Sequence, residues 1–230
     1  TRRLNVTKNF AKRVFALMLV MAICNGIAIP LINHFKPKPP PPVTKSDIEQ
    51  YFIAYFGEKP KNPPVGEVKS EIEKELKAAF KKQEKEALQL YQKGNKAYKN
   101  NQFKEAIASF EDALKIVKIP SFYLSLGNSY LVTSDFRKAL TAYQTALELF
   151  QAKEDRKGEG ATLGNLGLAY RDLGQVEKAI GYYKQALAIS REIGDRQGEG
   201  NHLGNLGNAY HALGQVEKAI GYYKQALAIS

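Results

Sequence analysis

Residues 151–190 read QAKEDRKGEGATLGNLGLAYRDLGQVEKAIGYYKQALAIS, and residues 191–230 repeat this stretch with identity at 30 of 40 positions. Self-similarity at a fixed period is the sequence signature of a protein built from stacked, similar units. In such a stack each unit buries its apolar face only against its neighbours, so the chain needs no central core. The duplication therefore predicts the architecture of the folded part before any single residue is considered.

The same pattern extends towards the N-terminus. Residues 121–160 keep its apolar and small positions at the same spacing, namely at Tyr123, Leu126, Gly127, Tyr130, Ala139, Tyr143 and Ala146. A weaker copy, 33 residues upstream of that one, keeps Gly94, Ala106, Phe110 and Ala113. We therefore expect four units, at residues 87–120, 121–160, 161–200 and 201–230, of which the last is the shortest.

Within each unit the apolar positions recur every three or four residues, which is the period of an α-helix. Gly174 and Gly214 divide the last two units, and glycine readily takes the left-handed conformation that ends a helix. Each unit is therefore predicted to be a helical hairpin, and the fold to be all-α. Gly167 would lie where the two helices approach closely, while Tyr170 and Tyr183 would fill the space between hairpins.

The sequence resembles the tetratricopeptide repeat family in a motif that recurs with few changes in three units, Leu163-x2-Leu166-Gly167-x2-Tyr170 followed by Ala179-x3-Tyr183. The resemblance implies a right-handed α-solenoid that binds peptides or proteins and has no chemistry of its own. Gln151 and Arg191 replace the proline that usually closes the second helix, and the spacer 194–200 makes the period 40 residues. This variant is similar to the repeats of kinesin light chain, of Pins-type polarity adaptors and of many bacterial repeat proteins.

The formal net charge of +11 is concentrated at the N-terminus. Residues 1–38 contain seven lysines and arginines and no acidic residue, so they supply +7 and leave +4 for the other 192 residues. A repeat array with so little net charge is expected to have a mixed-charge, solvated surface. We therefore predict no nucleic-acid partner for the repeats.

Residues 14–32 form an uncharged, nearly continuous apolar run of 19 residues, close to the roughly 20 that cross a bilayer as a helix. We assign residues 1–13 to a basic flank and 14–35 to a transmembrane helix. Positive flanks tend to stay in the cytoplasm, so the repeats are expected outside it. The alternative is a cleaved secretory signal with small residues around Gly26 and Ala28. Either alternative would export the repeats.

Residues 36–66 are predicted to be a proline-rich linker, because the run at 36–43 favours a stiff, extended chain. A short aromatic helix at 47–56 lies inside this linker and would either pack on the first hairpin or rest in the lipid headgroup layer. Residues 67–86 carry an apolar stripe among lysines and glutamates, which indicates a leading helix. Its continuity with the first repeat helix is left open by the sequence.

Few residues suit catalysis or metal binding. The chain contains three histidines, His34, His202 and His211, and one cysteine, Cys24, so a zinc cluster or a Cys-His pair is not expected. The carboxylates are expected on solvated helix faces. We therefore predict no catalytic residue, no metal site and no cofactor. Three glycines resemble a nucleotide loop only superficially and are predicted to lie in a turn: Gly158, Gly160 and Gly164.

The last two units indicate where a ligand would bind. Residues 161–190 and 201–230 differ at five positions, all in the first helix: Ala161/Asn201, Thr162/His202, Leu168/Asn208, Arg171/His211 and Asp172/Ala212. The resemblance places such positions on a concave groove. Asparagine amides there could hold the backbone of an extended peptide, or could instead bond neighbouring helices. The candidate groove residues are Asn95, Asn128, Asn165, Leu168, Arg171, Asn201, Asn205, Asn208 and His211.

These observations predict a membrane-tethered, extracytoplasmic adaptor that holds a peptide or protein segment in its groove. The lysines and arginines of the family's two-carboxylate clamp are absent, so chaperone-tail binding is not expected; the corresponding positions are Tyr91, Ser125, Ala161 and Asn165. One alternative is the recruiting or sensing portion of a larger enzyme with a catalytic domain beyond residue 230. Another is self-association through the C-terminal end.

Overall fold

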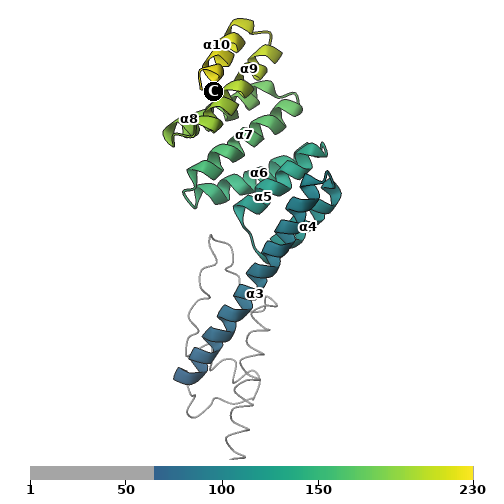
Figure 1. Ribbon diagram of the computed structural model, residues 1–230, viewed down its shortest axis with the longest axis vertical. Coiled ribbons are helices and arrows are strands. Elements are labelled where there is room, and N and C mark those ends of the chain that lie inside the picture. Colours follow the sequence, from purple (N-terminus) through teal and green to yellow (C-terminus); the bar gives the residue numbers. More distant parts are fainter. Residues whose placement is uncertain (1–64, 230) are drawn as a thin grey trace, which may run out of the picture. The chain divides into compact units, whose positions relative to one another are not determined.

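The computed structural model describes residues 65–229, which form eight α-helices and no strand (Figure 1). The helices are α3 (Val65–Lys99), α4 (Phe103–Ile116), α5 (Pro120–Val132), α6 (Phe136–Gln151), α7 (Arg156–Asp172), α8 (Val176–Glu192), α9 (Arg196–Ala212) and α10 (Val216–Leu227). The predicted transmembrane helix at 14–35 and most of the predicted linker lie outside the described residues, and both stay predictions. No helix within 65–229 combines the length and the apolar character needed to cross a membrane.

Chain contacts divide the protein into two units, Thr1–Lys85 and Glu86–Ser230. In the first, the described residues belong to the N-terminal part of α3, which begins at Val65 and runs without a break to Lys99. The leading helix and the first repeat helix are therefore one continuous helix. The second unit contains the repeats.

The predicted helical hairpins are confirmed within the described residues. A residue with left-handed backbone ends the first helix of each hairpin, and these residues are Asn101 (φ 60°), Ser134 (φ 61°), Gly174 (φ 73°) and Gly214 (φ 71°). The residue after Gly174 closes the turn by donating its backbone N–H to the Tyr170 carbonyl at 2.9 Å. The left-handed conformation predicted for Gly174 and Gly214 is thus present, and it is the one that glycine adopts without strain.

Each hairpin packs a glycine of its first helix against an aromatic ring of its second. The pairs are Gly94–Phe110, Gly127–Tyr143, Gly167–Tyr183 and Gly207–Tyr223, and a Cβ atom added to any of these glycines would overlap the ring. Tyr143 and Tyr183 are fully buried. The close approach predicted at Gly167 is confirmed. Tyr183 and Tyr170 were both predicted to fill the space between hairpins, but Tyr183 packs on Gly167 of its own hairpin and Tyr170 stacks on Tyr182, with ring centroids 5.2 Å apart.

The predicted turn at Gly158, Gly160 and Gly164 is wrong, because all three residues lie inside α7. That helix begins earlier than the sequence suggested, since the Asp155 carboxylate accepts a hydrogen bond from the Gly158 backbone N–H at 2.9 Å and caps it. Asp195 caps α9 in the same way at 3.0 Å. The glycines serve close packing, because a Cβ atom on Gly158 would overlap the Phe150 ring.

Successive hairpins stack through contacts of α4 with α5, α6 with α7 and α8 with α9. The first helices α5, α7 and α9 also contact one another in order. We call the surface formed by these three helices the first-helix face. It carries most of the candidate groove residues.

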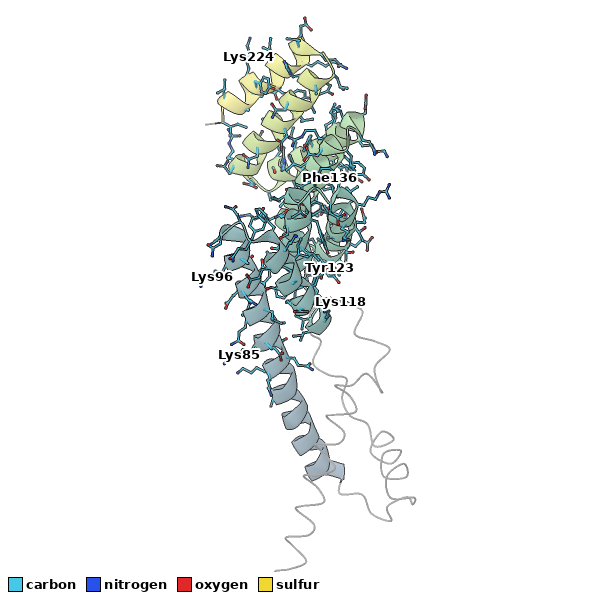
Figure 2. All side chains as sticks on the ribbon, turned by 90° about the vertical axis from the view of Figure 1, so that its right-hand side faces the viewer. Lys85, Lys96, Lys118, Tyr123, Phe136 and Lys224 are labelled. Atoms are coloured by element: carbon cyan, nitrogen blue, oxygen red, sulfur yellow. The ribbon has the colours of Figure 1, made fainter. Side chains whose placement is uncertain are left out.

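The outer surface of the repeats has charges of both signs. Lysines such as Lys96 and Lys224 are exposed on it (Figure 2). Several other lysines are paired with acidic residues, in the pairs Lys93–Glu105, Lys115–Asp112 and Lys138–Asp135. Such exposed pairs contribute little to stability but neutralise the local field.

Candidate functional site

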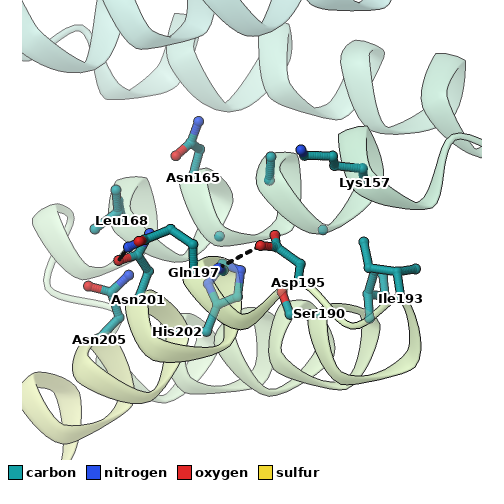
Figure 3. Close-up of a pocket in the computed structure, with 15 residues that line it drawn as sticks. Lys157, Asn165, Leu168, Ser190, Ile193, Asp195, Gln197, Asn201, His202 and Asn205 are labelled. Atoms are coloured by element: carbon teal, nitrogen blue, oxygen red, sulfur yellow. Dashed lines mark hydrogen bonds between the residues drawn. The ribbon is translucent and has the colours of Figure 1, made fainter. Parts of the chain in front are cut away.

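A pocket of about 530 Å³ lies between α7 and α9 on the first-helix face (Figure 3). The α7 side contributes Lys157, Asn165 and Leu168 among others, and the end of α8 contributes Ile189 and Ile193. The polar residues on the α9 side are Asp195, Gln197, Asn201, His202 and Asn205. The pocket therefore combines apolar patches with several side-chain amides, a composition common in ligand sites.

The pocket is open because α7 has small residues where it borders the pocket. These residues are Gly160, Ala161 and Gly164, whereas the matching positions of α5 hold Pro120, Ser121 and Leu124. The absence of a side chain at Gly164 also lets the His202 ring approach, since a Cβ atom there would lie 2.6 Å from Cε1 of His202. The glycines of α7 that the sequence suggested for a turn thus shape the site.

Four of the nine predicted groove residues line this pocket: Asn165, Leu168, Asn201 and Asn205. The other five lie elsewhere in the repeats, with Asn95 on α3, Asn128 on α5, Arg171 at the end of α7, and Asn208 and His211 on α9. The structure thus brings together the central part of the predicted groove.

Two of the predicted asparagines hold the hairpins together instead. The Tyr143 hydroxyl donates to Oδ1 of Asn128 at 2.8 Å, and the Tyr223 hydroxyl donates to Oδ1 of Asn208 at 2.8 Å. Nδ2 of Asn165 donates to the same Asn128 oxygen at 2.9 Å and so links successive hairpins. The alternative role as helix-bonding amides therefore holds for Asn128 and Asn208, while Asn165 combines this role with a place in the pocket.

Asn205 is the pocket asparagine whose side chain forms the fewest hydrogen bonds. Its side-chain amide forms no hydrogen bond within residues 65–229, and the residue is only partly buried. Asn201 is exposed, and its Oδ1 accepts from Nε2 of Gln197 at 3.2 Å. The donors and acceptors of Asn205 are thus free for a ligand.

Leu168 stands where the neighbouring hairpins have Asn128 and Asn208. The equivalent tyrosine, Tyr183, consequently has a buried hydroxyl with no hydrogen-bonding partner. Burial raises the pKa of Tyr183 to about 12, so the hydroxyl stays protonated at neutral pH. The leucine therefore adds apolar surface to the pocket and leaves a polar atom unpaired behind it.

His202 was not among the predicted site residues, although the sequence showed that it replaces the threonine found at the matching position of the preceding unit, Thr162. Both side chains are buried, with exposed fractions of 7% for His202 and 0% for Thr162. Thr162 Oγ1 donates to the Gly158 carbonyl at 2.7 Å, whereas Nδ1 of His202 has no partner. Burial lowers the pKa of His202 below its ordinary value of 6.5, although nearby Asp195 opposes this shift. The substitution of threonine by histidine between two nearly identical units was the signal that could have identified His202.

Arg171 and His211 occupy matching positions but have different surroundings. Nε of Arg171 donates to Oδ1 of Asp172 at 2.9 Å. In the next unit both members of this pair are exchanged, for His211 and Ala212, and His211 is exposed. Neither residue lines the pocket, so the structure places both at the margin of the predicted groove.

The model of the tetratricopeptide repeat family matches residues 118–192 and 158–230. The chain belongs to the tetratricopeptide repeat family. Among its relatives, mitochondrial import receptor subunit TOM70 of Saccharomyces cerevisiae (strain ATCC 204508 / S288c) is 36% identical over 94 residues, which cover 39% of this chain. G-protein-signaling modulator 1 of Homo sapiens is 31% identical over 100 residues, or 41% of this chain. The matches span only 15% of the length of either relative.

A solved structure, that of BtubC (BKLC) from P. vanneervenii, superposes with a TM-score of 0.61 at 19% identity. The match covers 71% of this chain and 77% of that one. At this identity the likeness shows a shared fold and nothing about ligands. It agrees with the stacked hairpins described above.

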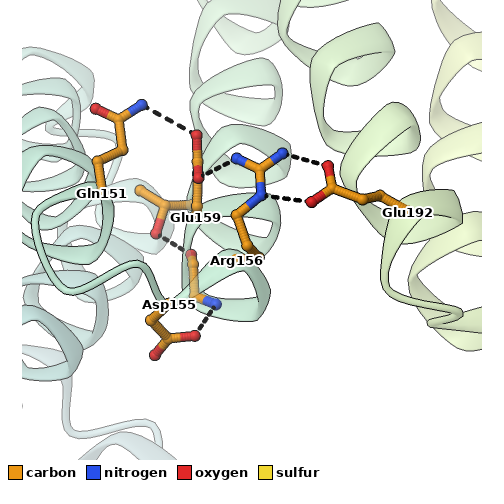
Figure 4. A network of polar contacts seen from close by, with 7 residues as sticks. Gln151, Asp155, Arg156, Glu159 and Glu192 are labelled. Carbon is orange, nitrogen blue, oxygen red and sulfur yellow. Dashed lines mark hydrogen bonds and ion pairs between the residues drawn. The ribbon is translucent and has the colours of Figure 1, made fainter.

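Buried carboxylates link successive tetratricopeptide hairpins, contrary to the expectation that the carboxylates lie on solvated faces. Glu159 is 8% exposed and accepts hydrogen bonds from Gln151 at 3.0 Å and from Arg156, whose guanidinium also reaches Glu192 (Figure 4). Because a guanidinium and a neutral amide donate to it, this glutamate is buried without an unpaired charge. It belongs to the joint between hairpins and not to the pocket.

The next tetratricopeptide unit has a similar buried glutamate, with Arg191 in the place of Gln151. Glu199 is also 8% exposed and accepts from Arg191 and from Arg196, each at 2.9 Å. The hydrogen bond from Arg191 is the main cause that lowers the pKa of Glu199. Within residues 65–229 no three histidine, cysteine or acidic side chains are grouped in a way that could hold a metal ion.

Proposed function

We propose that this tetratricopeptide repeat protein is an interaction scaffold that holds an extended peptide segment along its first-helix face, with the pocket between α7 and α9 as the main contact. The observation that carries the proposal is an open pocket lined by side-chain amides, of which Asn205 has no partner within the described residues. Unpaired amides in a concave site are ready donors and acceptors for another chain.

An extended peptide suits this surface because a peptide backbone presents donors and acceptors in alternation, and an asparagine side chain can meet both. Asn201 and Asn205 are one helical turn apart on α9, so they face the same side of the helix. Across the pocket, the Asn165 carbonyl oxygen is still available, since its bond to Asn128 uses only the nitrogen. Leu168, Ile189 and Ile193 offer apolar surface for side chains of the ligand.

We also propose that the apolar run at 14–32 tethers the repeats to a membrane and presents them outside the cytoplasm. The support is the length of this run and its positive flanks. The proline-rich run at 36–43 would act as a stiff spacer between the membrane and the repeats. Labelling of an introduced cysteine in the repeats by an impermeant reagent on intact cells would test this orientation.

The test of ligand binding starts with a phage-displayed peptide library selected against the full-length chain. Enriched peptides are then measured against Asn205→Ala, with Asn100→Ala as the control because Asn100 is an exposed asparagine in a turn away from the first-helix face. Loss of one hydrogen bond predicts affinity about tenfold lower for Asn205→Ala, with an unchanged melting temperature. Peptides that bind both variants as tightly as the wild-type chain would overturn the assignment of the groove.

A further inference from the structure

We propose that the pocket between α7 and α9 receives a carboxamide side chain, glutamine or asparagine, from the bound peptide. This inference rests on the proposed function and adds the chemistry that the pocket would select. It is carried by three features of the pocket: an unpaired buried nitrogen, a balance of charges, and apolar walls of limited extent.

The unpaired nitrogen is Nδ1 of His202. The residue lines the pocket and is only 7% exposed, and Nδ1 has no hydrogen-bonding partner. The preceding hairpin has no such unpaired atom, because Thr162 at the matching position donates a hydrogen bond to the Gly158 carbonyl. Buried polar atoms in native proteins are nearly always paired, so the orphaned nitrogen points to a polar group supplied from outside. Gly164 packs against this ring, since a Cβ atom on it would lie 2.6 Å from Cε1 of His202.

The pocket has one full charge of each sign. Lys157 comes from α7 and Asp195 from the start of α9, and Figure 3 shows the two on facing sides of the pocket. Lys157 forms no ion pair within the described residues, and Oδ1 of Asp195 accepts only the capping hydrogen bond from Gly198. A ligand with a net charge would be attracted by one of these residues and repelled by the other. An uncharged group with both an acceptor and a donor would satisfy both.

A carboxamide is such a group, because its oxygen accepts and its nitrogen donates. In this pocket the oxygen would accept from Lys157, while the NH₂ group would donate to Asp195 or to Nδ1 of His202. The methylene groups of glutamine would lie on Ile189, Ile193 and Leu168. A purely apolar side chain would fill the same space but would leave the lining amides and the histidine nitrogen unpaired, which weakens binding.

Three blocked amino acids can test this choice: N-acetyl-glutamine methylamide and its glutamate and leucine counterparts. Each is titrated into the full-length chain while the ring signals of His202 are followed by NMR. We expect the glutamine probe to shift the His202 signals with an affinity about tenfold higher than either counterpart, as one additional satisfied hydrogen-bonding group would give. Equal or tighter binding of the glutamate or leucine probe would overturn the proposal.

Matched variants show whether the probe occupies the pocket. Ala161→Leu narrows the pocket and should abolish the response, whereas Ser121→Leu introduces the same residue at the matching position of α5 and should leave the response intact. His202→Thr introduces the residue of the preceding hairpin and should remove the preference for glutamine; in this variant the backbone amide signals of Asn201 and Asn205 are followed, because the histidine ring is absent. A glutamine response that persists in Ala161→Leu would contradict the inference. The proposed function would survive that result if peptides from the library still depended on Asn205, so the two failures are distinguishable.

Discussion

At the scale of single residues, one tyrosine position in three hairpins has two different environments. Tyr143 and Tyr223 donate their hydroxyl hydrogens to asparagines of their own hairpins, whereas Tyr183 faces Leu168 and has no partner. The backbone and the ring packing against glycine are otherwise repeated. The hydrogen bond of this tyrosine is therefore optional for the fold, and its contribution can be measured by comparing hairpins.

We expect Tyr143→Phe to destabilise the protein by about 1 kcal/mol, because it removes a partly buried hydrogen bond and leaves Asn128 with fewer donors. Tyr183→Phe removes a hydroxyl that has no partner, so it should leave the free energy of unfolding unchanged or raise it. Urea unfolding of the two variants measures the difference. Equal losses in both would show that the Tyr183 hydroxyl is paired in solution.

A pH dependence is expected from His202. Its pKa in the folded protein lies below the ordinary 6.5 because burial disfavours the charged ring, so the unfolded chain takes up the proton first. The stability that the neutral, buried histidine provides is complete above about pH 6.5 and is lost as the pH falls below this value towards the folded pKa. Urea midpoints measured from about pH 8 to about pH 5 should therefore decrease on acidification.

His202→Thr should remove this part of the acid sensitivity, because threonine does not titrate and is already accommodated at Thr162. His211→Thr is the matched control, since it makes the same substitution at an exposed position of the same helix. If both variants keep the wild-type pH profile, the loss of stability at low pH comes from another group.

The asparagines show how far the sequence alone could go at this scale. Four of the nine predicted groove residues line the pocket: Leu168 and Asn201 were marked by substitutions between near-identical units, and Asn165 and Asn205 by being asparagines of the first helices. The sequence did not assign Asn128 and Asn208 to the tyrosines, since each pair is separated by 15 residues and is joined only after the hairpin closes. The pairing pattern is also broken at Leu168, while the tyrosine is retained.

At the scale of helices, small residues set how closely two helices approach. Gly167→Ala would push a Cβ atom into the buried Tyr183 ring and should cost about 1–3 kcal/mol. Gly181→Ala, on the open side of α8, meets nothing within 4 Å and should stabilise the helix by about 0.5–1 kcal/mol. Thermal unfolding of the pair gives the comparison. Stabilisation by both substitutions would show that the ring can move aside.

The cap of α7 can be tested in the same way. Asp155→Ala removes the acceptor for the Gly158 N–H and should cost about 1 kcal/mol, with faster amide exchange in the first turn of α7. Asp155→Asn keeps a side-chain oxygen and should retain most of the protection. The capping aspartate and the helical position of Gly158 were not predicted, because a cluster of glycines also fits a turn. The packing of Gly158 on Phe150 and of Gly164 on His202 forms only when the helices come together, so the local sequence does not reveal it.

At the scale of the whole array, identical helices differ because their neighbours differ. Residues 175–190 and 215–230 have the same sequence, yet Ile180 is 8% exposed and Ile220 is 46% exposed. Leu187 and Leu227 differ in the same way, at 6% and 75%. The sequence predicted the stacking, but burial in a stack depends on which neighbours are present. Self-association through the face of α10 stays a prediction.

This difference in burial predicts that the same substitution lowers the free energy of unfolding by different amounts at the two positions. Leu187→Ala should destabilise the chain by about 2–4 kcal/mol, since it opens a cavity between α8 and α9, whereas Leu227→Ala should cost less than about 1 kcal/mol. Urea unfolding at two protein concentrations provides the measurement. A large, concentration-dependent cost for Leu227→Ala would show instead that α10 is covered by a second molecule.

The identical sequences of residues 175–190 and 215–230 also affect how the number of repeats in the gene can change. Excision of one forty-residue block, or insertion of another by unequal recombination, would join helix surfaces that already fit each other, because the joint after α8 would meet the same partner sequence. Lineages could thus lengthen or shorten the array in whole steps without inventing a new interface. Each added block would bring one more first helix, which is the element in which the last two hairpins differ.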